Sequence, residues 1–151
     1  MDQLVIDAQL ALGTVQWGLP YGVANRTGQP RAQEVSAMLA LARSSAITTL
    51  DTARAYGESE AVIGQLLGGD ESFHIVTKTD PGLLDGDPTE DLALHRLHES
   101  LTTSRTLLER ERLDTVLLHR PNQRQALNGV VWDALRQERD QGRVGAIGIS
   151  A

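Results

Sequence analysis

Residues 47–64 read ITTLDTARAYGESEAVIG, and this stretch holds an apolar run, an acidic residue and a segment of helical character in succession. The run ITTL is short, rich in β-branched residues and bounded by polar ones, which favours a buried strand. The apolar residues of 59–67 recur at helical spacing. A strand that leads into a helix is the unit from which parallel α/β sheets are built. The stretch therefore predicts one βα unit, with Asp51 directly after its strand.

The same unit recurs along the chain. Four more short apolar runs have the character of strands, namely LALGTV (10–15), HIVT (74–77), TVLL (115–118) and GAIGI (145–149). Helical periodicity predicts helices over residues 33–45, 59–67, 89–109 and 129–141. Residues 4–6 are a candidate for an additional short strand. The pattern thus predicts an α/β protein in which five strands alternate with four helices.

Capping residues mark the ends of two helices. Asp87, Pro88 and Glu90 are interpreted as an N-cap, a proline at the first helical position and a glutamate that returns to the cap. Gly142 follows the last predicted helix, where a left-handed residue ends a helix favourably. These signals place helix boundaries near residues 87 and 142.

Two architectures of parallel α/β sheet compete. A doubly wound sheet usually carries GxGxxG or GxxxxGK[ST] after a strand, and neither motif is present in this sequence. We therefore favour a TIM-type (β/α)8 barrel. A complete barrel takes ~250 residues, whereas this chain has 151. We expect a single domain, residues 1–151, that forms an incomplete barrel of about five βα units.

The composition excludes several classes of function. The formal charge of −6 argues against a nucleic-acid partner, because phosphate binding requires clustered positive charge. The absence of cysteine excludes a disulfide framework and a thiolate metal site. His95 and His98 lack a third ligand and are interpreted as a solvated helix face, so no metal site is expected. With no cationic leader and no apolar run of membrane-spanning length, we expect a cytoplasmic protein with no membrane partner.

Four polar residues directly follow predicted strands: Asp51, Lys78, His119 and Ser150. Their separations of 27, 41 and 31 residues each fit one βα unit, which takes roughly 30 residues in a barrel. Taken singly, these residues have plain structural interpretations, as a helix cap, a solvated charge, a structural imidazole and a turn residue. Taken together, they predict an active site, since barrels build their sites at the carboxyl ends of successive strands.

Lys78 is also the only lysine among the 14 basic residues of the chain. A compact ammonium with a tunable pKa differs chemically from a planar guanidinium. The choice of lysine here, in a sequence that otherwise uses arginine, favours a specific role for Lys78.

The strings LGTVQWG, LDTARAYGESEAVIG, IVTK, LLHRP and IGIS occur in an order and spacing that resemble the aldo-keto reductase superfamily, over essentially the whole chain. The most specific string is DTA-x-x-YG-x-SE. There the resemblance implies that Asp51 and Tyr56 are catalytic and that Glu60 opens the next helix. It implies in turn that Lys78 and His119 complete a catalytic tetrad. The string LPYGVANRTG resembles the corresponding segment of a bacterial branch of this superfamily, which is often linked to sugar and polysaccharide metabolism.

This resemblance implies an NAD(P)H-dependent oxidoreductase that reduces aldehyde or ketone carbonyls, some of them sugar-derived, to alcohols. Hydride transfer from the nicotinamide leaves an alkoxide that must be protonated. Free tyrosine, with a pKa of ~10, is too weak an acid at neutral pH unless a cation stabilises its phenolate. Tyr56 is therefore the expected general acid and Lys78 its cation, while Asp51 orients Lys78 and His119 directs the substrate oxygen.

NADP(H) is the cofactor that the resemblance implies, with NAD(H) as the alternative. It places Gly13, Thr14 and Asp51 beside the dinucleotide, and Ser150 on the nicotinamide carboxamide. Asparagine usually follows that serine in the family, whereas Ala151 follows it here. One expected contact to the carboxamide is therefore missing.

The resemblance also implies a pocket for a small-molecule carbonyl substrate, lined by Trp17, Tyr56 and His119. For Trp17, ordinary packing at the end of the barrel is the alternative interpretation. Tyr21 competes with Tyr56 as the acid, but nothing around Tyr21 in the sequence pairs it with Lys78.

Two other functions use the same barrel. One is a regulatory module that binds nicotinamide cofactor without turnover, and the other is an isomerase or aldolase in which Lys78 forms a Schiff base. An incomplete barrel also leaves strand edges unpaired and inward apolar side chains exposed. We therefore expect the chain to self-associate or to bind a complementing C-terminal segment, and not to be an efficient enzyme alone.

Overall fold

The computed structural model of the chain describes residues 10–23 and 25–150. Within these residues one parallel sheet contains β1 (Ala11–Gly13), β2 (Thr49–Asp51), β3 (His74–Lys78), β4 (Leu113–Leu118) and β5 (Val144–Ile149). The helices are α1 (Val15–Gly18), α2 (Ala32–Ser44), α3 (Ser59–Leu67), α4 (Glu90–Leu108) and α5 (Val130–Asp140), with short 3-10 turns η1 (Pro121–Arg124) and η2 (Ala126–Gly129). The predicted five strands and four long helices are confirmed, and the short α1 is an addition. The candidate strand at residues 4–6 lies outside the described part.

Each strand pairs in parallel with the next strand of the chain, so that the order across the sheet is β1-β2-β3-β4-β5. This sequential order is that of a barrel wall, whereas a doubly wound sheet reverses its order at a switch point. β1 and β5 lie at the two edges of the sheet, so the wall is open. The predicted incomplete barrel of about five βα units is therefore confirmed.

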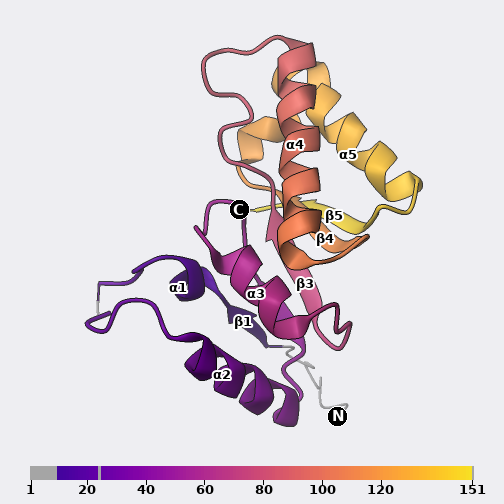
Figure 1. Cartoon of the computed structure of the whole chain (residues 1–151). Helices are drawn as coiled ribbons and strands as arrows, with labels where there is room; N and C mark the ends of the chain where they lie inside the picture. Colours follow the sequence, from indigo (N-terminus) through magenta and orange to yellow (C-terminus); the bar gives the residue numbers. More distant parts are fainter. Residues whose placement is uncertain (1–9, 24, 151) are drawn as a thin grey trace, which may run out of the picture.

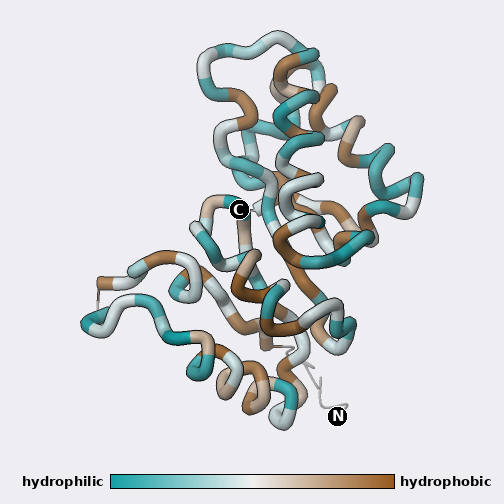
Figure 2. The backbone as a smooth tube through the Cα atoms, viewed as in Figure 1, coloured by the Kyte–Doolittle hydropathy of each residue, from teal (hydrophilic) through white to brown (hydrophobic). Residues whose placement is uncertain are grey.

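The hydrophobic core lies between the sheet and its helices. Alternate strand residues Leu50, Ile75 and Val116 are buried on the helix side, where Figure 1 shows α3 and α4 in front of β3 and β4. The backbones of α3 and α4 lie close together at Gly64, where an added Cβ would be 2.1 Å from the Leu107 carbonyl oxygen. In Figure 2 the turns of α4 and α5 alternate between brown and teal, as expected of helices with one buried face. No helix in the described residues is both long and apolar enough to cross a membrane.

The opposite face of the sheet carries a mixture of small, polar and apolar residues. It carries the strand residues that alternate with the buried ones, among them Ala11, Gly13, Thr49, His74, Val76, Thr115, Leu117, Ala146 and Gly148. His74 and Thr115 are hydrogen-bonded across this face, with Nε2 and Oγ1 2.9 Å apart. The expectation of inward apolar side chains exposed to water therefore holds for Ala11 and Ala146, which are exposed, and in part for the half-buried Val76 and Leu117.

The start of α4 differs from the capping prediction. Thr89 is the N-cap residue, and its Oγ1 accepts a hydrogen bond from the Leu92 N–H at 3.3 Å. Asp87 instead has a φ of 56°, so it lies in a left-handed turn before the helix. The predicted N-cap was two residues too early. Gly142, in contrast, has the predicted left-handed conformation just beyond α5, with a φ of 76°.

Candidate active site

The four polar residues predicted to converge lie along one rim of the sheet. Asp51 is level with Val76, and Lys78 lies two residues further along β3, on the same face. Lys78 pairs with Leu117 of β4, and His119 lies two residues beyond Leu117 in the direction of that strand. The pairing of β4 with β5 continues past Ile149, where the Ser150 N–H donates to the Leu118 carbonyl at 2.9 Å. The register therefore brings all four residues to the carboxyl end of the wall.

Lys78 is the centre of this arrangement. Its ammonium is buried and donates to Asp51 Oδ1 at 2.5 Å, to the Thr52 carbonyl at 3.0 Å and to the Tyr56 hydroxyl at 3.5 Å. The Nζ atom also lies 5.0 Å from the centroid of the Tyr56 ring. A buried ammonium requires such partners, because desolvation of an unpaired charge is costly. The structure thus brings together three of the four predicted catalytic residues, and the hydroxyl that contacts Lys78 belongs to Tyr56 and not to the exposed Tyr21.

His119 is half-buried at the end of β4. Its backbone N–H donates to Thr79 Oγ1 at 3.2 Å, and its ring Nδ1 is buried with no hydrogen-bond partner in the described part of the chain. Burial lowers the pKa of His119 below its usual range, and the positive charges of Lys78 and Arg120 lower it further. The ring is therefore neutral at physiological pH, so one of its nitrogens carries a proton and the other is an acceptor.

Gln123 holds the segment around His119, although sequence reasoning did not identify it. It is fully buried in η1, and its Oε1 accepts from the Arg120 N–H at 3.2 Å and from Thr79 Oγ1 at 3.3 Å. Its Nε2 donates to the carbonyls of Asp80 and Pro81. The turn that follows β4 is thereby tied to the turn that follows β3. The available signal was a glutamine just after LLHRP, which resembles an ordinary loop residue.

The residues predicted to hold the cofactor fall into two groups. Gly13 is exposed at the end of β1, with open space where a Cβ would lie, and Ser150 is half-buried beyond β5. Both remain accessible at the rim and fit a ligand laid across it. Thr14 is fully buried: its Oγ1 donates to the Asp51 carbonyl at 2.9 Å and accepts from Ser59 Oγ at 2.7 Å. Its hydroxyl therefore anchors the strand that carries Asp51, and the place of Thr14 beside the dinucleotide stays a prediction.

Trp17 belongs to the hydrophobic core and is 5% exposed. It also lines a cavity of about 1010 Å³ beside β1, together with Gly13 and Gln16. Both interpretations of Trp17 are thus compatible with its position, and its contact with a substrate stays a prediction. Ala151, which replaces the expected asparagine, lies outside the described residues.

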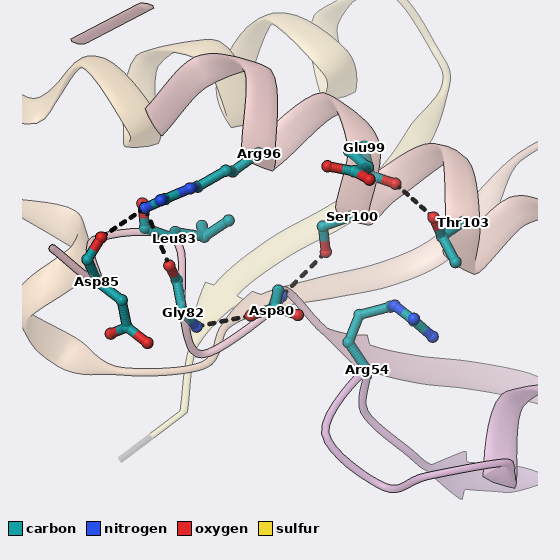
Figure 3. Close-up of a pocket in the computed structure, with 9 residues that line it drawn as sticks. All are labelled: Arg54, Asp80, Gly82, Leu83, Asp85, Arg96, Glu99, Ser100 and Thr103. Carbon is teal, nitrogen blue, oxygen red and sulfur yellow. Dashed lines mark hydrogen bonds between the residues drawn. The ribbon is translucent and has the colours of Figure 1, made fainter. Parts of the chain in front are cut away.

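A second cavity, of about 420 Å³, lies between the turn after β3 and the side of α4 (Figure 3). Arg96 of α4 donates to the carbonyl oxygens of Gly82, Leu83 and Asp85, which fixes this turn against the helix. Arg54, from the segment between β2 and α3, lies on the other side of the cavity.

The segment that carries Tyr56 is packed directly on Gly18. A Cβ added at Gly18 would lie 1.7 Å from the Tyr56 carbonyl oxygen and 2.4 Å from the Ser59 nitrogen, both backbone atoms that cannot rotate away. We predict that Gly18→Ala lowers the free energy of unfolding by about 3 kcal/mol or more, as strong overpacking does. Urea unfolding followed by circular dichroism measures the change. Gly13→Ala is the matched control for folding, because a Cβ there meets nothing within 4 Å; equal stability of the two variants would contradict this packing.

Three solved structures similar to the chain are described as aldo-keto reductases. A protein from Pseudomonas aeruginosa assigned to this class is 32% identical, with a TM-score of 0.74 over 93% of this chain and 54% of its own. A thermostable aldo-keto reductase solved with the inhibitor epalrestat is 28% identical, with a TM-score of 0.67 over 92% of this chain and 47% of its own. An aldo-keto reductase from Klebsiella pneumoniae is 24% identical, with a TM-score of 0.65 over 93% and 44%. The chain thus spans about half the length of these structures.

Among curated proteins, none matches the chain significantly. The model of the aldo/keto reductase family matches residues 9–151, which is nearly the whole sequence. This match, the sequential parallel wall and the Pseudomonas structure agree with one another. The chain belongs to the aldo/keto reductase family.

Proposed function

We propose that the chain provides the proton-donating part of an NAD(P)H-dependent reductase that converts aldehyde or ketone carbonyls, some of them sugar-derived, to alcohols. The observation that carries the proposal is the position of Lys78 Nζ, within 2.5 Å of the Asp51 carboxylate and 3.5 Å of the Tyr56 hydroxyl. A tyrosine beside a buried cation is suited to give up its proton, and this is the acid that carbonyl reduction requires.

Each of these residues has a distinct part in the proposed reaction. The nicotinamide, when bound, supplies the hydride. Tyr56 donates its hydroxyl proton to the carbonyl oxygen as negative charge develops there, and Lys78 stabilises the phenolate that remains. Asp51 keeps Lys78 oriented through the 2.5 Å ion pair. Neutral His119 offers a ring N–H to the substrate oxygen, which fixes the carbonyl at the rim.

For the cofactor we propose NADP(H), with NAD(H) as the alternative. Gly13, Asp51 and Ser150 are the residues we assign to hold it, since all three lie at the rim and none is fully buried. The Klebsiella aldo-keto reductase was solved in complex with NADPH, which supports the choice. Trp17 is assigned to the wall of the substrate pocket.

We predict that the 151-residue chain does not persist as a monomer. Within residues 10–23 and 25–150, β1 and β5 each pair with a strand on one side only, and several residues on the sheet face away from the helices are exposed. Either self-association or the binding of a complementing C-terminal segment would cover these strand edges and this sheet face. Light scattering is expected to give more than the mass of one chain, and titration is expected to give weak NADPH binding. A monodisperse monomer that binds NADPH tightly and reduces aldehydes at ordinary rates would refute this prediction.

The proposed activity is testable in a completed barrel, in which residues 1–151 are joined to the C-terminal part of the Pseudomonas protein. We expect NADPH oxidation in the presence of aldehydes, followed at 340 nm. Cofactor binding without turnover, across a panel of aldehydes and sugar-derived carbonyls, would favour a regulatory module instead. Covalent trapping of a carbonyl substrate on Lys78 by borohydride would favour a Schiff-base enzyme.

A further inference from the structure

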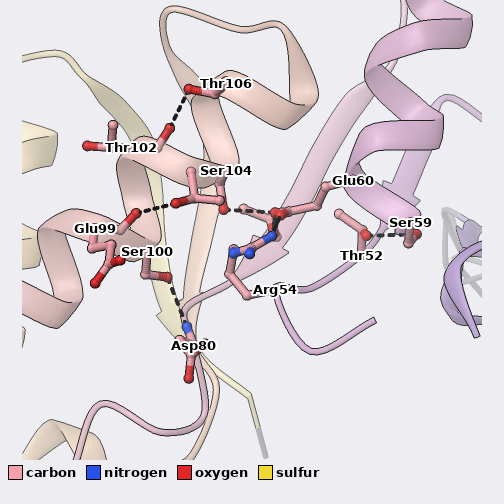
Figure 4. A network of polar contacts seen from close by, with 12 residues as sticks. Thr52, Arg54, Ser59, Glu60, Asp80, Glu99, Ser100, Thr102, Ser104 and Thr106 are labelled. Atoms are coloured by element: carbon pink, nitrogen blue, oxygen red, sulfur yellow. Dashed lines mark hydrogen bonds and ion pairs between the residues drawn. The ribbon is translucent and has the colours of Figure 1, made fainter. Parts of the chain in front are cut away.

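Glu60 is a fully buried carboxylate for which the proposed reaction has no direct use. Its Oε2 accepts from Arg54 Nη1 at 2.5 Å, and its Oε1 accepts from Thr77 Oγ1 at 2.6 Å and from Ser104 Oγ at 2.8 Å. Figure 4 shows the Arg54 guanidinium and the Ser104 hydroxyl both reaching this carboxylate. A buried charge is retained at a cost, so three donors gathered on one carboxylate call for an explanation.

Two of these donors are adjacent to the residues assigned to proton transfer. Arg54 lies two residues before Tyr56, in the segment that connects β2 to α3, and its backbone N–H donates to the Lys78 carbonyl at 3.2 Å. Thr77 immediately precedes Lys78 in β3. Glu60 therefore joins the segment that carries Tyr56 to the strand that carries Lys78. Ser104 only connects the carboxylate to α4.

We propose that Glu60 is a positioning residue, which sets the distance between Lys78 Nζ and the Tyr56 hydroxyl through Arg54 and Thr77. That distance is 3.5 Å, at the outer limit of a hydrogen bond, so a small displacement of either segment breaks the contact. The proposal rests on the proposed reductase function, since the Lys78–Tyr56 distance matters for proton transfer.

A second buried carboxylate, which is bonded to arginine, links α4 to α5. Glu138 of α5 accepts from Arg105 of α4 at 2.6 Å. The exposures are closely similar: the Arg54 side chain is 18% exposed and the Arg105 side chain 20%. Glu138 also accepts from Arg143 Nε and Nη2, at 2.9 and 2.5 Å, so it keeps one cation when Arg105 is replaced. Arg54→Gln and Arg105→Gln each remove one arginine from a buried carboxylate, one linked to Tyr56 and Lys78 and the other not.

The chain itself offers two specific probes. Lys78 is the only lysine, and Tyr21→Phe leaves Tyr56 as the only tyrosine. In that background, lysine labelled with ¹⁵N at Nζ and tyrosine labelled with ¹³C at Cζ each give one side-chain NMR signal from the 151-residue chain. We expect Arg54→Gln to shift both signals by more than their linewidths and Arg105→Gln to shift neither. The proposal is overturned if Arg54→Gln leaves both signals in place, or if the two variants shift them equally.

A second pair of variants makes the same comparison without removing a charge, should Arg54→Gln not fold. Thr77→Val and Ser104→Ala each remove one hydroxyl from Glu60 Oε1. Thr77→Val is expected to move the Tyr56 and Lys78 signals and Ser104→Ala to leave them unchanged, whereas equal effects would make Glu60 a structural residue only. These signals do not depend on turnover. A completed barrel that fails to reduce carbonyls would refute the reductase function, while unmoved signals would refute the role of Glu60.

Discussion

Tyr56→Phe is expected to lower carbonyl reduction by the completed barrel about 10²- to 10⁴-fold, which is the usual contribution of a general acid. The substitution removes one hydroxyl and keeps the ring, so the segment packed on Gly18 is preserved. NADPH binding is expected to change little, because the hydroxyl contacts Lys78 and is proposed to serve the substrate oxygen, not the dinucleotide. Steady-state kinetics with an aldehyde, together with fluorescence titration of NADPH, measures both effects.

The matched control for this variant is Tyr21→Phe, the same chemical change at the other tyrosine of the chain. Tyr21 is 59% exposed in the loop after α1. Its variant is expected to retain normal turnover. Near-normal turnover by Tyr56→Phe would show that another group supplies the proton.

Lys78→Arg is expected to lower turnover on the order of 10²-fold, comparable to the loss of one preorganised donor in an active site, although the charge is kept. The ammonium of Lys78 is 6% exposed and reaches three oxygens from one point, namely those of Asp51, Thr52 and Tyr56. A guanidinium is planar and larger and cannot make these three contacts from the same position. The measurement is kcat for aldehyde reduction at saturating NADPH.

Circular dichroism of Lys78→Arg serves as the control for folding, since the larger side chain enters a buried site. A folded variant with low activity supports a specific role for the ammonium. If the folded variant keeps most of its activity, the argument from the only lysine of the chain is wrong, and a diffuse positive charge suffices.

The strands, the long helices and the convergence of Asp51, Lys78 and His119 could be predicted from the sequence. These features follow from short-range periodicity and from the phase of polar residues relative to apolar runs. The face of each strand that meets the helices was not predicted. Thr49, His74 and Thr115 are polar in the sequence, but only the register places them together on the open face.

Other features depend on contacts between distant parts of the chain. The burial of Thr14 results from Ser59, which lies 45 residues away. The environment of Glu60 includes Ser104, 44 residues away. The N-cap at Thr89 depends on local geometry, because two left-handed residues, Gly86 and Asp87, delay the start of α4. The periodicity of the sequence encodes neither these distant contacts nor this local geometry.

Transfer of deuterium from NADPH deuterated at C4 of the nicotinamide tests the central claim most directly. The completed barrel is incubated with this cofactor and an aldehyde, and the alcohol is analysed by mass spectrometry, beside the same barrel carrying Tyr56→Phe. We predict one deuterium on the carbinol carbon of the product, with product formation strongly reduced in the variant. An alcohol without deuterium, or no alcohol from a folded barrel that binds NADPH, would contradict the assignment of this chain to carbonyl reduction.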